Sequence, residues 1–363
     1  MRVVLLVTDL ERGGTPLRLA RLARGLRCAG VEVHVGCLGP PGPVSRELDG
    51  VGIPTFACGA AGAWDLRALW RLGRHVRRIR PDLLHATLTH ANVAARLVGG
   101  WLGVPVLTST ATIEVERRWH LAVERWTAWM DHGHIVNSAA LADHVVKTFG
   151  LARRRVHVVP PAIDPPPQRG ERSVARRQLG LPEDAFVVLW AGRLDRVKRL
   201  EVALRCVELL AGAGCHLVLA GDGPERQRLQ RRAARSPAQG RIRFLGWVTD
   251  LGPALSAADV FLCPSRTEGM PNAVLEAMAF GLPIVGSDIP ALRELSGAEG
   301  RLVLVAGGDA GAWAAELQVL RNDAARRAAL GRRAAEWARA RLDPQRAARA
   351  LLGVYERVLA GRR

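Results

Sequence analysis

The sequence predicts an α/β protein with two doubly wound parallel sheets. Strand-like apolar runs alternate with helix-like runs twice over, first within residues 1–161 and again within 186–305. Continuous apolar strands such as 3–7 are typical of parallel sheets that helices cover on both faces. A proline-rich stretch, 160–168, separates the two series and predicts a semi-rigid linker. The chain has 363 residues, which is enough for two domains of ordinary size.

Composition narrows the class of protein. No apolar run reaches the roughly 18 residues of a membrane span, and the first nine residues lack the layout of a signal peptide. The six cysteines form no Cys-x-x-Cys pair, so we expect buried thiols and a cytoplasmic protein. The net charge of +18 is spread over both halves and suits acidic partners. No nucleic-acid-binding motif is present, and we expect no nucleic acid partner.

The first half begins with strand 3–7, a glycine-bearing loop and a helix over 17–30. Two glycines between a strand and a helix permit a tight turn and close approach of a phosphate. Strands follow at 31–37 and 53–57, with a loop at 39–44 between them. Residues 64–80 then predict a basic amphipathic helix with six arginines. A solvated helix that covers the sheet explains this pattern, and a patch on anionic lipid is the alternative.

Histidines follow the next strands. His85 and His90 belong to a strand and loop at 81–90, and we place both at the C-terminal edge of the sheet. Open α/β sheets bind ligands at that edge. A helix is expected at 91–100, and strand 104–111 ends at Ala111. His120 lies in the arginine-rich helix that follows. Strands at 134–138 and 156–161 complete this half.

The second half places two cations after its first strand, 186–191. Arg193 and Lys198 lie five residues apart in a loop, and an arginine fork and a flexible ammonium can together neutralise a diphosphate. A helix at 200–210 and strands at 215–220 and 241–245 come next.

The most informative stretch is 265–283. A buried strand, 259–263, runs into a polar loop that holds Glu268 and Gly269, and Pro271 precedes a short helix over 272–279. The free N–H groups of a helix start favour an anion. Glu268 and Glu276, eight residues apart, can accept hydrogen bonds from sugar hydroxyls at the two ends of such a ligand. The arrangement suits a sugar nucleotide.

This run, Glu-Gly-Met-Pro-Asn-Ala-Val-Leu-Glu from Glu268, resembles the EX7E signature of family-4 retaining glycosyltransferases with the GT-B fold. The resemblance covers essentially the whole chain, strongly from Trp190 to Glu294 and loosely before Pro160. It is closest in kind to bacterial enzymes of cell-surface polysaccharide or glycolipid assembly. It implies an acceptor-side domain at 1–168, a nucleotide-sugar domain at 169–344, and a last helix, about 345–363, that packs back on the first domain.

The resemblance also implies roles for particular residues. Arg193, Lys198 and Glu268 would be catalytic. His85, His90 and His120 are the acceptor-side candidates. The donor-binding residues would be Gly14, Thr15, Arg193, Lys198, Gly246, Trp247, Val248, Glu268, Gly269, Met270, Pro271, Asn272, Ala273 and Glu276.

The implied reaction moves a hexosyl or N-acetylhexosaminyl group (EC 2.4) from a nucleotide-diphosphate sugar, a UDP-sugar being favoured, to a glycan or lipid-linked acceptor. Such enzymes are assigned a front-face displacement without a protein nucleophile, and we expect neither metal nor cofactor. Peripheral contact with anionic lipid on the inner face of the membrane is a further expectation. The chain departs from the family at Ala111, where many relatives carry a histidine.

Two other classes remain open. A catalytically weak sugar-nucleotide-binding protein of the same fold is consistent with Ala111. A nicotinamide-dependent enzyme is disfavoured, because neither half has GxGxxG followed by an acid about twenty residues on.

Overall fold

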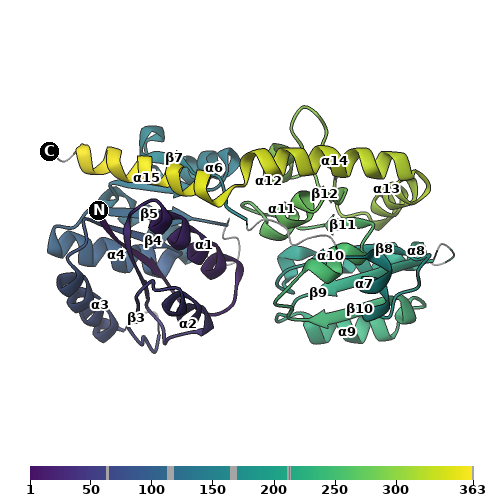
Figure 1. Cartoon of the computed structure of the whole chain (residues 1–363), viewed down its shortest axis with the longest axis horizontal. Coiled ribbons are helices and arrows are strands. Elements are labelled where there is room, and N and C mark those ends of the chain that lie inside the picture. The colour runs from purple at the N-terminus through teal and green to yellow at the C-terminus, as the bar shows by residue number, and fades with distance from the viewer. Residues whose placement is uncertain (63–64, 113–117, 164–169, 211, 213, 362–363) are drawn as a thin grey trace. The chain divides into compact units, whose positions relative to one another are not determined.

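The computed structural model divides the chain into two compact units (Figure 1). It describes residues 1–62, 65–112, 118–163, 170–210, 212 and 214–361. The first unit comprises Met1–Asp164 and Leu342–Arg363, and the second comprises Pro165–Arg341. The division falls within the predicted linker, of which residues 164–168 lie outside the described part of the chain.

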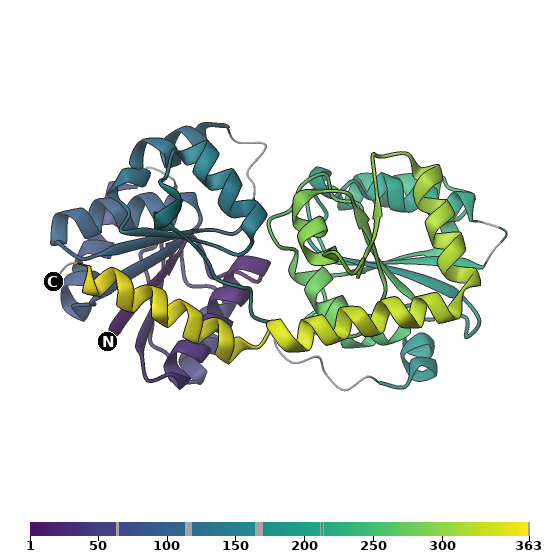
Figure 2. The same ribbon diagram turned by 90° about the horizontal axis from the view of Figure 1, so that it is seen from above.

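Each unit contains a parallel sheet with helices on both faces (Figure 2). Among the described residues, the strand order is β3-β2-β1-β4-β5-β6-β7 in the first unit and β10-β9-β8-β11-β12-β13 in the second. Both orders reverse direction beside their first strand, so both sheets are doubly wound. The predicted fold class is therefore confirmed.

Strands of the first unit are β1 (Arg2–Val7), β2 (Glu32–Cys37), β3 (Thr55–Ala57), β4 (Leu83–Thr87), β5 (Val106–Thr110), β6 (Gly133–Val136) and β7 (Val156–Val158). Its helices are α1 (Gly14–Cys28), α2 (Pro43–Gly50), α3 (Leu66–Ile79), α4 (Thr89–Leu102), α5 (Arg118–Thr127), α6 (Ala139–Phe149) and α15 (Pro344–Ala360), with 3-10 turns η1 (Ala128–Met130) and η2 (Arg153–Arg155).

Strands of the second unit are β8 (Phe186–Ala191), β9 (Cys215–Ala220), β10 (Ile242–Gly246), β11 (Val260–Cys263), β12 (Ile284–Ser287) and β13 (Val303–Val305). Its helices are α7 (Arg172–Gln178), α8 (Leu200–Leu209), α9 (Arg226–Ala234), α10 (Gly252–Ala257), α11 (Asn272–Ala279), α12 (Pro290–Ser296), α13 (Ala310–Asn322) and α14 (Ala324–Arg341), with 3-10 turns η3 (Arg196–Lys198) and η5 (Gln239–Arg241).

Strand β1 shows why the apolar runs are continuous. Val3, Leu5 and Val7 join one buried cluster, with residues of α1, α2 and α15. Val4 and Leu6 join another, with residues of α3 and α4. Successive side chains of a strand point to opposite faces, so a sheet with two helical layers needs apolar residues at every position.

Helix α15 belongs to the first unit although it ends the described chain. It packs along α1 (Figure 1), and Leu351, Val354 and Tyr355 are buried in the core that α1 shares with β1. A Cβ added to Gly25 of α1 would lie 2.8 Å from the Cβ of Ala348, so the two helix backbones approach closely at that point.

Several local predictions were wrong. The predicted loop at 39–44 ends earlier, because Pro43 starts helix α2, which was not predicted and in which Val44 and Leu48 are buried. Helix α1 begins at Gly14, three residues earlier than expected. Of the predicted helix at 64–80, residue 64 lies outside the described part.

Five of the cysteines are buried as expected, but Cys28 is exposed. It lies in the last turn of α1, on the side away from the core.

Candidate functional site

The switch point of the second sheet lies between β8 and β11. These neighbouring strands begin the two opposite windings of the sheet, and each is followed by a loop that carries predicted site residues. Open α/β sheets bind ligands at such a point, outside the carboxyl ends of the strands. Residues 192–199 form the loop after β8, and 264–271 form the loop after β11.

Hydrogen bonds join the two loops. The N–H of Arg266 donates to the carbonyl oxygen of Val197 at 2.8 Å. Arg199 Nε donates to the carbonyl oxygen of Pro264 at 2.7 Å, and its Nη2 donates to Ser287 Oγ at 3.0 Å. Arg199 has a left-handed backbone (φ 49°), which ends η3 and directs the chain into α8. The loops therefore support one another as one surface.

Lys198 and Glu268 form an ion pair on that surface. Lys198 Nζ lies 2.6 Å from Glu268 Oε1, and their side chains are 22% and 7% exposed. The residues are 70 positions apart in the sequence. A short, largely buried pair has a fixed geometry, so the ammonium and the carboxylate can act on adjacent groups of one ligand.

Arg193 is not part of this pair. Its side chain is 72% exposed, and Nε lies 3.7 Å from Asp195 Oδ2. An exposed guanidinium next to a carboxylate is weakly held and can turn toward an anion. The structure thus gives the two predicted phosphate-binding cations different surroundings.

Helix α11 begins directly after the second loop. Pro271 is its N-cap and provides no side-chain cap, and Asn272 and Ala273 begin its first turn. Gly269 and Met270 are buried just before it, and Glu276 lies one turn further on, half-buried. The helix start, Glu268 and Glu276 keep the order that the sequence predicted.

The loop after β10 lies next to this surface through backbone contacts. Gly246 ends β10 with φ 70°, and its carbonyl oxygen accepts a hydrogen bond from the N–H of Gly221 at 2.7 Å. A Cβ on Gly221 would lie 1.8 Å from the carbonyl oxygen of Gly192, so only glycine allows this approach. Trp247 is 45% exposed, and Val248 follows it half-buried.

Sequence reasoning missed three supports of this site. Arg199 joins the loops, Ser287 holds Arg199 at the end of β12, and Ser265 is fully buried with its Oγ 3.7 Å from Cys263 Sγ. Burial raises the pKa of Cys263 to about 12, so this thiol stays protonated. Only Arg199 had a signal, its position beside Lys198.

In the first unit, Gly14 and Thr15 lie in the opening turn of α1 and not in a preceding loop. Gly13 is the N-cap, with extended backbone and no side-chain cap. The turn follows the loop after β1, at the C-terminal edge of the sheet.

The three candidate histidines separate into two places. His85 lies in the middle of β4 and is buried, so its placement at the sheet edge was wrong. Its ring nitrogens are hydrogen-bonded to Tyr355 of α15 and Ser109 of β5, and its pKa is lowered to about 3, mainly by burial. A neutral, enclosed imidazole of this kind is a poor general base at neutral pH.

His90 and His120 lie together. Helix α4 begins earlier than expected, so His90 is in its first turn, and the ring centroids of His90 and His120 are 5.1 Å apart. Trp119 packs edge-on against both rings. Ala111 lies directly after β5, which ends one residue earlier than predicted, and it is buried, with its carbonyl oxygen accepting a hydrogen bond from Asn137 Nδ2 at 3.1 Å. The residues Ile113 and Glu114 after it lie outside the described part.

Among the described residues, no group of three or more His, Cys, Asp or Glu side chains is arranged to hold a metal ion. None of the described helices combines the length and apolar character that crossing a membrane requires.

Comparison with known proteins identifies relatives along both units. The family models described as "Glycosyltransferase Family 4" and "Glycosyl transferases group 1" match residues 12–166 and 185–323. A D-inositol 3-phosphate glycosyltransferase of Salinispora tropica is 30% identical, over 92% of this chain and 74% of that protein. A 2-deoxystreptamine glucosyltransferase of Streptomyces kanamyceticus is 28% identical, over 96% of this chain and 100% of that protein.

Solved structures share the fold at lower identity. HepE of Anabaena in complex with UDP superposes with a TM-score of 0.86 at 19% identity, over 98% of this chain and 100% of that one. Sucrose-phosphate synthase of Thermosynechococcus elongatus gives 0.83 at 21%, over 99% and 100%. Family models along both units and a relative at 30% identity establish the family. The chain therefore belongs to the family-4 glycosyltransferases of the GT-B fold and is a glycosyltransferase.

Proposed function

We propose that the chain transfers a hexosyl or N-acetylhexosaminyl group from a nucleotide-diphosphate sugar to a glycan or lipid-linked acceptor, with retention of anomeric configuration. The observation that carries this proposal is the Lys198–Glu268 ion pair above the switch point of the second sheet. A UDP-sugar is the favoured donor, and HepE, which shares the fold, was crystallised with UDP and with UDP-glucose.

In the proposed donor site, different residues contact different parts of the ligand. Lys198, Arg193 and the start of α11 stabilise the charge that grows on the leaving diphosphate, which is commonly the largest contribution to catalysis. Glu268 holds hydroxyls of the donor sugar, and Glu276 holds the ribose. Because Lys198 and Glu268 are hydrogen-bonded to each other, a ligand that binds one of them must change the position or hydrogen bonding of the other.

The remaining contacts are assigned in the same way. Residues 246–248 lie beside the base, and Gly269, Met270 and Pro271 shape the backbone that the sugar and diphosphate approach. Gly14 and Thr15 of the first unit bind the donor from the acceptor-side domain.

The proposed reaction is a front-face displacement. The bond between the anomeric carbon and the diphosphate oxygen breaks, and a bond from the same face to the acceptor oxygen forms. The acceptor's proton passes to the departing phosphate oxygen, so no protein nucleophile is needed. Lys198 and Arg193 supply the positive charge, and we propose that no metal or cofactor takes part. His90 and His120 are placed on the acceptor side.

The test is a transfer assay with wild-type protein. UDP-glucose, UDP-N-acetylglucosamine and GDP- and ADP-sugars are offered with membrane lipid extract, and with 2-deoxystreptamine and D-inositol 3-phosphate, the compounds in the relatives' names. We expect nucleoside diphosphate release that depends on acceptor, and a product whose anomeric proton shows retention. Tight UDP binding without any turnover would instead support the catalytically weak sugar-nucleotide-binding protein. An inverted product would overturn the mechanism.

The same proposal places the enzyme in the cytoplasm, peripherally on the anionic inner face of the membrane. Exposed tryptophans lie on consecutive outer elements of the first unit: Trp70 of α3 (57% exposed), Trp101 of α4 (63%), Trp126 of α5 (81%) and Trp129 of η1 (73%). We call these four residues the tryptophan face. Tryptophan favours membrane interfaces, where one end of the ring is apolar and the other wet.

Arginines accompany the tryptophan face. The guanidinium of Arg74 lies 4.8 Å from the ring centroid of Trp70, and that of Arg77 lies 5.0 Å from that of Trp101. Helix α3 packs beside α4 and α4 beside α5, so the four tryptophans lie on neighbouring elements of the unit. Arginine is attracted to anionic lipid, and tryptophan inserts into the membrane interface. This supports membrane contact over a purely solvated face.

A further inference from the structure

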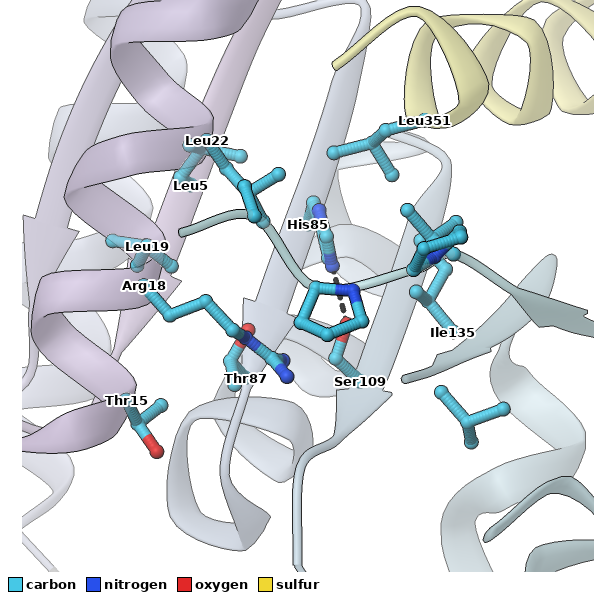
Figure 3. Close-up of a pocket in the computed structure, with 15 residues that line it drawn as sticks. Leu5, Thr15, Arg18, Leu19, Leu22, His85, Thr87, Ser109, Ile135 and Leu351 are labelled. Atoms are coloured by element: carbon cyan, nitrogen blue, oxygen red, sulfur yellow. Dashed lines mark hydrogen bonds between the residues drawn. The ribbon is translucent and has the colours of Figure 1, made fainter. Parts of the chain in front are cut away.

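A small pocket lies wholly within the first unit, at the carboxyl ends of the central strands. Helix α1 forms one wall, β4, β5 and β6 form the floor, and residues 159–162 cross over it (Figure 3). The enclosed volume is about 20 Å³, which is room for one water-sized group. The pocket can therefore take one oxygen of a small group but not a sugar ring.

The side chain of Arg18 points into this pocket from α1 (Figure 3). Arg18 is 9% exposed and has no hydrogen bond or ion pair to any described residue. Burial lowers its pKa to about 10, so it remains protonated at neutral pH. An unpaired buried charge is costly, and folded proteins normally pair it.

The other arginines buried to this extent follow that rule. Arg96 pairs with Glu124 and Asp131, Arg176 pairs with Asp259, and Arg301 pairs with Glu299. Arg18 alone among the buried arginines of the described residues has no carboxylate partner. The guanidinium of Arg18 can therefore pair with an anionic group of a ligand.

Two hydroxyl groups face the same space. Thr87 is 4% exposed, and its hydroxyl has no hydrogen bond to any described residue. Ser109 Oγ is hydrogen-bonded to Nε2 of His85. The Nδ1 atom of the same ring lies 2.6 Å from the Tyr355 hydroxyl. Within the described part of the chain the buried Tyr355 hydroxyl has no other hydrogen-bond partner, so we infer that it donates its proton to Nδ1 of His85. His85 is neutral and then carries its proton on Nε2, which donates to Ser109. The hydroxyl proton of Ser109 is left for the pocket.

We propose that this pocket is an oxyanion-binding site, in which the guanidinium of Arg18 and the hydroxyls of Thr87 and Ser109 bind one oxygen of a phosphate or carboxylate group. Its residues offer hydrogen-bond donors and no carboxylate, and its walls are apolar. The proposal that this group belongs to the acceptor rests on the proposed function, which assigns the first unit to the acceptor. The diphosphate of the donor is the other source of the same chemistry.

The first experiment measures binding of inorganic phosphate and of acetate to the full chain by calorimetry at constant ionic strength. Arg18→Met should weaken phosphate binding at least about tenfold, as loss of a charge-assisted contact does. Ser109→Ala should weaken it less. Arg24→Met is the matched control, because Arg24 lies exposed on the same helix, and its phosphate affinity should equal that of wild type. Equal affinity in wild type and Arg18→Met would overturn the proposal.

Thermal unfolding separates binding from a structural role. Without ligand, Arg18→Met should melt at a higher temperature than wild type, because it removes an unpaired buried charge. A lower melting temperature would show that Arg18 supports the fold and would count against the site. Phosphate should raise the melting temperature of wild type more than that of Arg18→Met.

Competition identifies the source of the oxyanion. If the acceptor supplies it, phosphate and UDP bind together, and phosphate raises the KM for the acceptor found in the transfer assay without changing kcat. Displacement of phosphate by UDP would assign the pocket to the donor and overturn the acceptor assignment. Absence of transfer from every donor would end the proposed function, while phosphate binding that depends on Arg18 would still support the oxyanion pocket.

Discussion

At the scale of single residues, the two lysines of the chain allow a matched comparison. Lys198 is largely buried against Glu268, whereas Lys147 is exposed on α6. Lys198→Ala should weaken UDP binding by about 2–5 kcal/mol, because loss of this desolvated cation leaves a phosphate of UDP without its charge partner. Lys147→Ala should leave the affinity unchanged. Calorimetric titration with UDP measures both, and similar affinities in the two variants would remove Lys198 from the donor site.

Arg193 should matter less than Lys198 in the same titration. Its side chain is exposed and only loosely paired with Asp195, so the protein does not hold it in place. An Arg193→Ala loss as large as that of Lys198→Ala would mean that the loop after β8 closes over the ligand.

The two glutamates should have different effects on binding and turnover. Glu268→Ala should abolish transfer yet keep or improve UDP affinity, because Lys198 loses its competing partner. Glu276→Ala should weaken UDP binding itself, because the ribose loses an acceptor. The measurements are UDP affinity and initial transfer rate for each variant. If both variants lose UDP affinity to the same extent, the assigned division of roles is wrong.

These residues also show what a sequence can predict about a site. The motif placed Glu268, Glu276 and the start of α11 in order, because their spacing is local. It could not predict the ion pair with Lys198, which depends on two strands meeting at the switch point. Arg18 looked like any helix arginine, because only the folded pocket shows that it lacks a partner.

At the scale of elements, the tryptophan face predicts binding to anionic vesicles. The double variant Trp126→Ser/Trp129→Ser should bind more weakly at all salt concentrations, because the indole rings no longer enter the interface. Arg74→Gln/Arg77→Gln should lose mainly the part of binding that salt weakens. Co-sedimentation with anionic and neutral vesicles measures both.

The matched control removes arginines from the second unit. Arg231, Arg232 and Arg235 lie exposed at the end of α9, and changing all three to Gln should leave vesicle binding intact. If this control loses as much vesicle binding as Arg74→Gln/Arg77→Gln, the general positive charge of the protein and not the tryptophan face holds it to lipid.

Sequence patterns predicted some of the helices and strands and missed others. Strands and long helices were predicted because their apolar periods are clear, and α3 was recognised as basic and amphipathic. Helix α2 was missed because it is short and follows a run of Gly and Pro. Trp101, Trp126 and Trp129 lie far from Trp70 in sequence, so only the fold shows that they lie on neighbouring elements.

At the scale of the whole molecule, the two units should respond differently to mild acid. Burial lowers the pKa of His85 to about 3, and the unfolded chain titrates near 6.5. Below about pH 6.5 the unfolded state therefore binds more protons, and the free energy of unfolding falls by up to about 1.4 kcal/mol per pH unit. Burial also lowers histidine pKa values at three further positions of the first unit and at one of the second: His75, His144, His157 and His216.

Calorimetry at about pH 7 and about pH 5 checks this. The transition of the first unit should fall further in temperature than that of the second. Tyr355→Phe identifies the first transition, because it leaves Nδ1 of His85 without its donor and should cost that unit about 1–3 kcal/mol. Equal shifts of both transitions on acidification would contradict the burial of His85.

The return of α15 to the first unit has a consequence for synthesis on the ribosome. The surface of α1 around Gly25 is covered by α15, a helix that is translated after the entire second unit. At ordinary elongation rates that interval lasts on the order of ten seconds or more. The half that emerges first is therefore completed last, and its nascent form presents an uncovered apolar face to chaperones while the later half already folds.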